Sequence, residues 1–470
     1  MTLQLAFLVG YSVFLIALGL AIGRLVKSTG MFFVADRKLG PVLLFATLLA
    51  ANIGAGSTVG AAGLGYRDGI SAWWWVGSAG IGSLMLAFWI GPRIWQIAAR
   101  HDLRTVGDFL ELRYGPSVRA VVATLLWLGT LAILAGQLIA VSIILNVVAG
   151  VPRYVGCLIG GIVMTSYFAA GGLLTSAWVN AVQLVVLLVG FGIALPMSLS
   201  AAGGWSAVMA TDAAAAPGYL NLWQGGSSGW IYAAMLVPAF IVSPGLLQKI
   251  YGARDEKAIR IGVAANALVL LVFACIPPLL GMIARVHHPE LANHELALPA
   301  LLVHELPLAV GTLGLAAVFS AEVSTCDAIL FMLATSLSQD LYRRFLNPQA
   351  SDARVLRVAR LAAVGGGALG VALAIVVPTV IGALTLFYSL LSVSLFVPIV
   401  AGFHYRRAGT PEALVAIGAG VSILVAVHLG TGGQGIGGWT PALIGLMASG
   451  LGFAMVALAR AKAGKRPAES

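Results

Sequence analysis

The chain is dominated by long apolar runs that are separated by short polar connections. A helix needs about 20 apolar residues to cross a bilayer. On that criterion we count 13 candidate spans, approximately 3–25, 40–65, 71–92, 119–148, 154–175, 178–201, 229–250, 260–284, 309–338, 356–379, 381–403, 411–429 and 438–459. Because lipid offers the backbone no hydrogen-bond partner, such spans must satisfy their N–H and C=O groups within helices. The sequence therefore predicts an all-α polytopic membrane protein.

The composition excludes several other classes of protein. Hydrophobic side chains make up 60% of the 470 residues and charged ones only 9%, which is far outside the range of soluble domains. The three cysteines lie inside apolar runs without paired spacing, so neither a disulfide framework nor a thiolate metal site is indicated. No HExxH or other metal-binding spacing of histidines occurs. We therefore expect neither an enzyme nor a partner of nucleic acid.

The positions of the basic residues predict how the chain crosses the membrane. If the N-terminus lies outside, all of the 27 lysines and arginines except Arg67, Arg153 and Arg285 fall in connections on the inner side. This is the pattern of the positive-inside rule. We expect a single transmembrane domain over residues 1–470 of a multi-pass protein, in a bacterial cytoplasmic membrane, with its N-terminus outside and its C-terminus inside.

Two of the predicted spans are interrupted near their middle. The second contains Asn52, Gly54 and Gly56, which are poor helix formers. The seventh contains Ser243, Pro244 and Gly245, and the proline removes a backbone donor there. Unwound backbone at this depth is tolerated where it lines a cavity. The other interpretation of the second interruption is close packing of helices through small residues.

The spacing of the two interruptions predicts the internal organisation of the chain. Broken helices at corresponding places in two halves indicate a transporter built from inverted repeats. Because the interrupted spans are five apart, we expect a five-plus-five inverted-repeat core with two broken helices. Its parts would be a first helix over 3–25, repeat one over about 40–201, repeat two over about 229–403, and two C-terminal helices over about 411–459.

The ninth span carries an unusual set of oxygen-bearing groups. Ala321, Ser324 and Thr325 are spaced i, i+3 and i+4, which places them on one helical face. Free carbonyls of an unwound segment, such as those of Ala50 and Ile53, would complete a shell of neutral oxygens for sodium. The alternative is that the two hydroxyls bond to their own preceding turn or to a neighbouring helix.

Two carboxylates, Glu322 and Asp327, flank this face by about 60° on either side. An ionisable group in a membrane helix is costly to bury and is by default a functional candidate. Three functions are open for each: to attract a cation, to hold a substrate amine or to carry a proton. The structural alternative is a polar bond to a neighbouring helix.

Four motifs in this order resemble the sodium:solute symporter family. They are "FFVADRKLGP" from Phe32, "TVGDFLELRYG" from Thr105, "LLQKIYGARDEK" from Leu246, and the run from Ser324 to Asp327 followed by "SQDLYR" from Ser338. The resemblance covers nearly the whole chain. It implies a leucine-transporter-like fold, alternating access, and a sodium site made by the carbonyls of Ala50, Ile53 and Ala321 and the hydroxyls of Ser324 and Thr325.

The resemblance also implies a substrate pocket between the broken helices. Its candidate lining residues are Asn52, Ser57, Trp74, Gln137 and Ser243. Trp74 belongs to a run of three tryptophans that would equally suit the membrane interface. Many members of the family carry an Asp where this chain has Asn52 or Asn180, so a second sodium site is in doubt here and Asn180 becomes a candidate for coupling.

Together these observations predict a sodium-coupled symporter that imports a small organic solute, with sodium as its co-transported ion. We expect the solute, sodium and the lipid bilayer as its partners, and a monomer. The alternative within transport is proton coupling through Glu322 or Asp327. The alternative from another class is a transporter-like membrane sensor.

Overall fold

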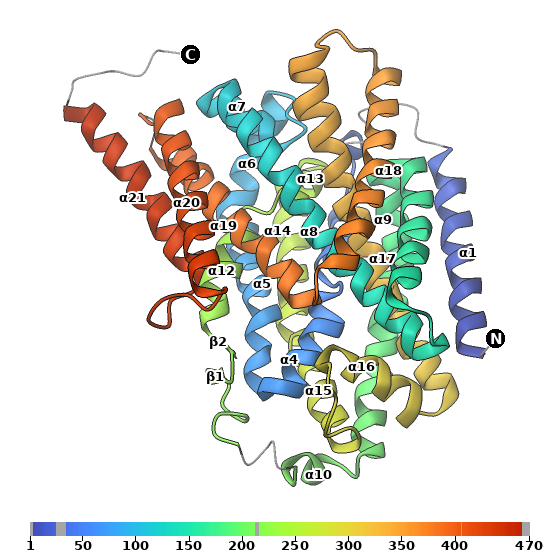
Figure 1. Cartoon of the computed structure of the whole chain (residues 1–470). Helices are drawn as coiled ribbons and strands as arrows, with labels where there is room; N and C mark the ends of the chain where they lie inside the picture. The colour runs from blue at the N-terminus through green and yellow to red at the C-terminus, as the bar shows by residue number, and fades with distance from the viewer. Residues whose placement is uncertain (1–2, 25–33, 212–215, 406, 463–470) are drawn as a thin grey trace.

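The computed structural model describes residues 3–24, 34–211, 216–405 and 407–462, which form a bundle of long helices (Figure 1). In the first half these are α1 (Leu3–Gly23), α3 (Pro41–Asn52), α4 (Ala61–Asp68), α5 (Trp73–Met85), α6 (Gly91–Arg100), α7 (Val106–Tyr114), α8 (Pro116–Ala149), α9 (Arg153–Ala201) and α10 (Trp205–Met209). The described strands are β1 (Gln224–Gly225) and β2 (Ser228–Gly229), which pair antiparallel.

The second half continues with helices of similar length. They are α12 (Ile231–Ile241), α13 (Pro244–Tyr251), α14 (Glu256–Phe273), α15 (Ile276–His287), α16 (Ala297–Ala300), α17 (Leu308–Thr335), α18 (Asp352–Val376), α19 (Val380–His404), α20 (Thr410–Thr431) and α21 (Pro441–Lys462). Helix α17 runs on without a break into the π-helical turns of η7 (Ser336–Leu346).

Helix α17 lies at the centre of the bundle. Every side chain from Gly314 to Thr335 is buried. A helix that is apolar around its whole circumference is typical of such a position. Its neighbours are α3, α8, α9 and α18, so the polar groups of this helix face other helices.

Both predicted interruptions are present. Helix α3 ends at Asn52, Ile53 is extended with φ −99° and ψ 99°, and the chain becomes helical again in the π-helical turn η2 (Gly56–Gly60). Helix α12 ends at Ile241, and α13 begins after the extended Ser243 with Pro244 in its first turn. Proline suits that position because the first N–H of a helix has no intrahelical acceptor.

The predicted number of 13 spans is not confirmed. In the described part of the chain, 11 helices are long and apolar enough to cross a membrane, and Pro41–Asn52 and Arg153–Ser166 are shorter apolar helices. The break after Asn52 leaves α3 too short to cross alone. The spans predicted at 154–175 and 178–201 fall within the single 49-residue helix α9.

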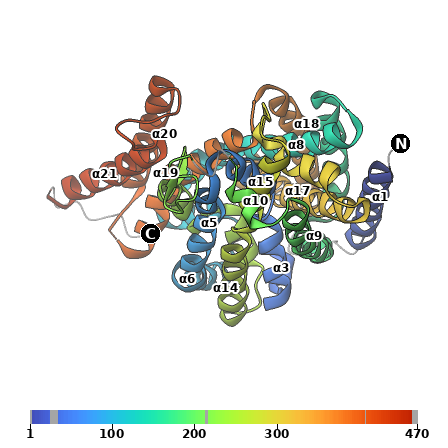
Figure 2. The same ribbon diagram turned by 90° about the horizontal axis from the view of Figure 1, so that it is seen from below.

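The edges of the bundle present apolar side chains outwards. Helices α20 and α21 pack on each other at one edge, and α1 lies at the opposite edge (Figure 2). Leu429 and Leu451 on the paired helices are 76% and 61% exposed. Such surfaces suit contact with lipid chains, as expected for a multi-pass membrane protein.

Candidate functional site: a sodium site beside a solute cavity

The break in α3 leaves backbone carbonyls free beside the middle of α17. The last carbonyls of a helix have no intrahelical donor. The carbonyl of Ala50 instead accepts hydrogen bonds from Ser324 Oγ at 2.9 Å and from Thr325 Oγ1 at 3.1 Å. Thr325 Oγ1 also lies 3.1 Å from the Ile53 carbonyl, and Ser324 Oγ lies 3.1 Å from that of Ala321. The structure thus brings together all five groups of the predicted sodium site.

This arrangement has the chemistry of a site for a small hard cation. Its three carbonyls and two hydroxyls are neutral oxygen ligands, the type preferred by hard metal ions. A hydroxyl has one proton, so each can donate to only one of its neighbouring carbonyls at a time. A bound cation would take the carbonyl lone pairs that now accept these protons, and it would coordinate the hydroxyl oxygens through their own lone pairs.

Gly54 and Gln137 hold the unwound segment against α17. The side chain of Gln137, on α8, accepts a hydrogen bond from the backbone N–H of Ala55 at 2.8 Å. A Cβ atom on Gly54 would lie 2.7 Å from Gln137 Oε1 and 2.7 Å from Thr325 Cβ, and even nearer to Thr325 Oγ1. Only glycine therefore lets the backbone approach Thr325 and Gln137 this closely.

The coupling candidates lie at three different places. Glu322 is fully buried, and its Oε1 lies 2.8 Å from the hydroxyl of Thr58 in η2, on the far side of the break. Asp327 is buried one helical turn after Ser324. Asn180 is fully buried on α9, and neither of its amide atoms has a hydrogen bond within the described residues.

A cavity of about 350 Å³, including its opening, lies between the two broken helices. It is lined by Ala51, Asn52, Ile133, Phe240, Ser243, Gly245, Leu246, Thr325, Ala328, Ile329, Met332, Phe387 and Tyr388. Asn52 and Ser243 are thus in the predicted position, and Asn52 Nδ2 donates to Asn266 Oδ1 at 3.0 Å. Among the described residues that line the cavity none is charged, and Thr325 belongs both to this lining and to the predicted sodium ligands.

The other predicted lining residues lie elsewhere. Ser57 donates to the Asn52 carbonyl at 2.8 Å and so closes the turn after the break. Gln137 binds the backbone of that turn, as described above. The ring of Trp74 packs at a tilt of 38° against that of Trp223, and its indole N–H donates to the Leu222 carbonyl at 2.9 Å. None of the three is among the residues that line the cavity.

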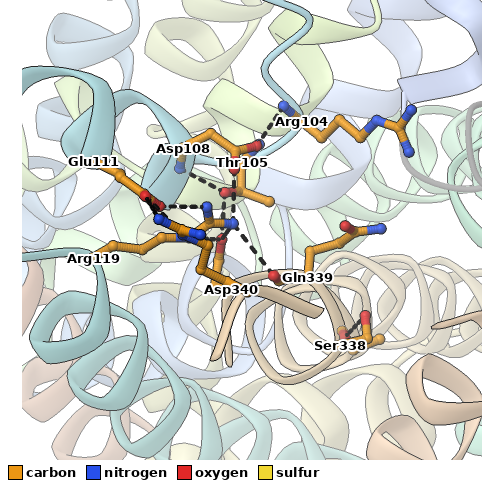
Figure 3. A network of polar contacts seen from close by, with 10 residues as sticks. Arg104, Thr105, Asp108, Glu111, Arg119, Ser338, Gln339 and Asp340 are labelled. Atoms are coloured by element: carbon orange, nitrogen blue, oxygen red, sulfur yellow. Dashed lines mark hydrogen bonds and ion pairs between the residues drawn. The ribbon is translucent and has the colours of Figure 1, made fainter. Parts of the chain in front are cut away.

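A second polar cluster, built around Arg119, lies beside η7, the continuation of α17 (Figure 3). Arg119 is at the start of α8 and has carboxylate oxygens of Asp108, Glu111 and Asp340 at 2.7, 2.8 and 2.8 Å. Thr105 donates to Asp340 at 2.6 Å and caps α7 by accepting from the Asp108 N–H. The cluster ties α7 and α8 to η7.

The sequence motifs "TVGDFLELRYG" and "SQDLYR" contain most of this cluster, but nothing in them showed that they meet. The hydrogen bond from Arg119 to Asp340 joins residues 221 positions apart. The contact between Thr58 and Glu322 spans 264 positions and was likewise not expected. In both cases the sequence offered one signal of such a contact, namely a carboxylate that would be buried and that has no obvious partner close by in the chain.

The family model of the sodium:solute symporter family matches residues 32–420. The chain is 29% identical over 428 residues to the sodium/pantothenate symporter of Escherichia coli (strain K12), with 85% of each chain covered. It is 25% identical over 394 residues to the sodium/glucose cotransporter of Vibrio parahaemolyticus, which covers 75% of this chain and 71% of that relative.

Two solved structures have the same fold. A Na⁺-coupled sialic acid symporter in a substrate-bound outward-open state superposes with a TM-score of 0.83 at 18% identity and covers 98% of both chains. The nucleobase-cation-symport-1 family transporter Mhp1 in a closed conformation has a TM-score of 0.62 at 15% identity, covering 93% of this chain and 95% of Mhp1. These likenesses confirm the fold class of a leucine-transporter-like bundle with two broken helices. From the match over residues 32–420, the chain belongs to the sodium:solute symporter family.

Proposed function

We propose that this protein is a sodium-coupled secondary active symporter that imports a small organic solute by alternating access. The observation that carries the proposal is the convergence of three carbonyls and two hydroxyls, from Ala50, Ile53, Ala321, Ser324 and Thr325, at the break of α3. These neutral ligands hold a sodium ion without trapping it, since no carboxylate belongs to the set. A transported ion must leave again in every cycle.

The position of Thr325 supports coupling between the ion and the solute. Its hydroxyl is a proposed sodium ligand and its side chain also lines the cavity. Sodium bound there would fix the unwound segment that carries Asn52 into the same cavity. This part of the cavity lining is then ordered for the solute only when sodium is present. Sodium can shift the conformational equilibrium in this way because a ligand acts through its different affinities for the two states.

The solute would occupy the cavity between α3 and the α12–α13 break. The lining combines apolar and aromatic side chains with the polar groups of Asn52 and Ser243. This is the usual composition of a site for a small organic molecule. With the N-terminus outside and the C-terminus inside, sodium entry would also draw on the membrane potential, about 2.3 kcal/mol per charge per 100 mV.

The proposal is tested by the melting temperature of the purified protein in detergent, in sodium chloride against potassium and choline chloride at matched ionic strength. We expect a sodium-specific rise, because a ligand that binds the folded state stabilises it. The rise should vanish in Thr325→Ala. The matched control is Thr335→Ala, which removes a buried hydroxyl of the same helix that bonds only to its own turn, at Phe331.

A wild-type protein that responds equally to all three salts would contradict sodium coupling. Transport into proteoliposomes driven by a pH gradient, without sodium, would instead favour the proton-coupled alternative. A sodium response that persists in Thr325→Ala would place the ion elsewhere in the bundle.

A further inference from the structure

Helix α18 has one face that packs on the bundle and one that no described element covers. The packed residues recur every three or four positions and face α8, α9 and α17. They include Val355, Ala359, Ala363, Gly366 and Gly370. The opposite face is exposed over the whole length of the helix, which lies at the edge of the bundle (Figure 2). In a membrane protein such a face contacts lipid.

The exposed face of α18 begins with three arginines, Arg354, Arg357 and Arg360, whose spacing of three residues keeps them on that face. None of them has a carboxylate within ion-pair distance in the described part of the chain. The first turn of α18 contains one acidic residue, Asp352, and its carboxylate lies 3.8 Å from Arg343. Residues 167–175 of α9, which lie outside the described side chains, include no acidic residue.

This arrangement is electrostatically unfavourable unless an anion lies nearby. Arg354 is in the first turn of the helix, where the free N–H groups and the helix dipole present a positive charge. Arginines three positions apart on a helix also repel each other. Because the described chain supplies no ion pair, the compensating anions come from the solvent or from the membrane.

Helix α14 has the same spacing of basic residues, but there the charges are balanced. Arg254, Lys257 and Arg260 are likewise three residues apart at the start of that helix. Asp255 lies 3.0 Å from Arg254, and Glu256 lies 4.0 Å from Arg260. The two helices therefore differ in whether the chain itself provides the anions, and α14 serves as an internal control for α18.

The exposed face of α18 continues from the arginines with apolar side chains. Leu361, Val364 and Leu369 are exposed on it. Gly365 leaves a gap between them, since an added Cβ would meet no atom within 4 Å. From Arg357 to its end, the helix is about 30 Å long. This length matches the thickness of the hydrocarbon core, so the arginines lie at the level of the lipid head groups.

We propose that Arg354, Arg357 and Arg360, together with the apolar side chains that follow them, bind an anionic phospholipid. The arginines hold the phosphate of the head group, because a guanidinium donates paired hydrogen bonds to phosphate oxygens. An acyl chain lies along Leu361 and Val364. A negatively charged membrane surface attracts clustered basic residues, and the bound head group relieves the repulsion between the arginines. The lipid is a partner of α18 in addition to the solute and sodium.

The test is a titration of the purified full-length protein in detergent with phosphatidylglycerol or with phosphatidylcholine of the same acyl chains, read by the melting temperature. Phosphatidylglycerol should raise the melting temperature of the wild type at lower concentrations, because a ligand that binds the folded state stabilises it. In Arg354→Gln/Arg357→Gln/Arg360→Gln the apparent affinity for phosphatidylglycerol should fall about a hundredfold, from about fivefold for each arginine near a charged surface.

The matched control is Arg254→Gln/Lys257→Gln/Arg260→Gln, which removes three positive charges with the same spacing from α14. We expect this variant to keep the preference of the wild type for phosphatidylglycerol. Equal losses in the two triple variants would indicate attraction to the total charge alone and would overturn the inference. A wild type that responds equally to both lipids would overturn it as well.

Inorganic phosphate distinguishes the head group of a lipid from a free anion. It has no acyl chain, so at the concentrations used for the lipid it should leave the melting temperature unchanged, and equal stabilisation by phosphate would overturn the inference. If the triple variant of α18 does not fold, Arg357→Gln decides. Its affinity for phosphatidylglycerol should fall about fivefold, and an unchanged affinity would contradict a lipid site at these arginines.

Discussion

Two buried polar clusters lie along the same continuous helix, α17–η7, and differ in where their cation comes from. The proposed sodium ligands near Ser324 and Thr325 are neutral oxygens without a cation of the protein among them. The cluster near Asp340 contains its own cation, Arg119. On the proposed function the first cluster binds and releases an ion from the medium, whereas the second already contains its cation and braces the fold. We expect the two to respond oppositely to mutation and to salt.

The largest effect should come from Arg119→Leu. It removes the cation that Asp108 and Asp340 share and leaves Glu111 with Arg344 alone, and breaking a buried ion pair costs about 3–5 kcal/mol. The free energy of unfolding in mild detergent should fall by that amount equally in sodium and potassium chloride. Arg260→Leu is the control, because Arg260 is exposed and its ion pair with Glu256 is long, at 4.0 Å. A loss of unfolding free energy that sodium chloride reverses and potassium chloride does not would contradict the distinction between the two clusters.

Gly54→Ala should chiefly affect the sodium cluster. Its added Cβ would collide with Thr325 and Gln137, and such overpacking costs about 1–3 kcal/mol. We also expect the sodium-specific rise in melting temperature to disappear. Gly365→Ala is the control, because a Cβ there meets no atom within 4 Å. An unchanged sodium response in Gly54→Ala would show that the close approach at the break is not required.

Gln137→Leu should have a smaller effect at the same place. The Ala55 N–H would lose its acceptor, and an unsatisfied buried donor costs about 1–3 kcal/mol. Because this bond holds the break, sodium affinity measured by titration of the melting temperature should fall as well. Gln183→Leu is the control, since the buried amide of Gln183 has no hydrogen bond within the described residues. Equal losses in the two variants would contradict a special role for Gln137.

The smallest effects should appear when pH is varied. Two carboxylates outside the membrane spans have pKa values shifted in opposite directions, so their contributions to stability should change oppositely with pH. Burial raises the pKa of Glu111, but Arg119 and Arg344 outweigh it and lower that pKa below its usual value. The stability from Glu111 is therefore present above pH about 4.3 and is lost as pH falls through the lowered pKa. The difference between wild type and Glu111→Gln, on the order of 1 kcal/mol, should shrink on acidification.

Glu295 is the opposite case. Burial raises its pKa above the usual value, although the N–H groups of Val380 and Ile381 donate to its carboxylate. Its contribution is full below the unfolded pKa and is lost as pH rises through the raised value. The advantage of wild type over Glu295→Gln should therefore grow on acidification. Melting curves at several pH values check both variants, and parallel trends would contradict the assignment.

The sequence predicted those features that depend on local pattern. The interruptions at Asn52–Gly56 and Ser243–Gly245 follow from glycine and proline within apolar runs, and both are present. The i, i+3 and i+4 spacing placed Ala321, Ser324 and Thr325 on one face, and the structure brings that face to the break. Their use as sodium ligands remains the proposal tested above.

Features that depend on packing between distant segments were not predictable in the same way. The charge pattern placed Arg119 and Lys249 in connections between spans, yet both side chains are buried. Gln137 was expected to line the solute cavity and instead binds the backbone of the unwound turn. The helical repeat shows which residues of one helix share a face. Which residues of other helices contact that face depends on tertiary packing.

The most direct test of the central claim is an experimental structure determined in sodium chloride at a resolution that shows bound ions. Our account predicts an ion coordinated by the carbonyls of Ala50, Ile53 and Ala321 and by the hydroxyls of Ser324 and Thr325. The hydroxyl protons would then point away from the Ala50 carbonyl. The same carbonyl still accepting hydrogen bonds from both hydroxyls, with no ion between them at saturating sodium, would contradict it.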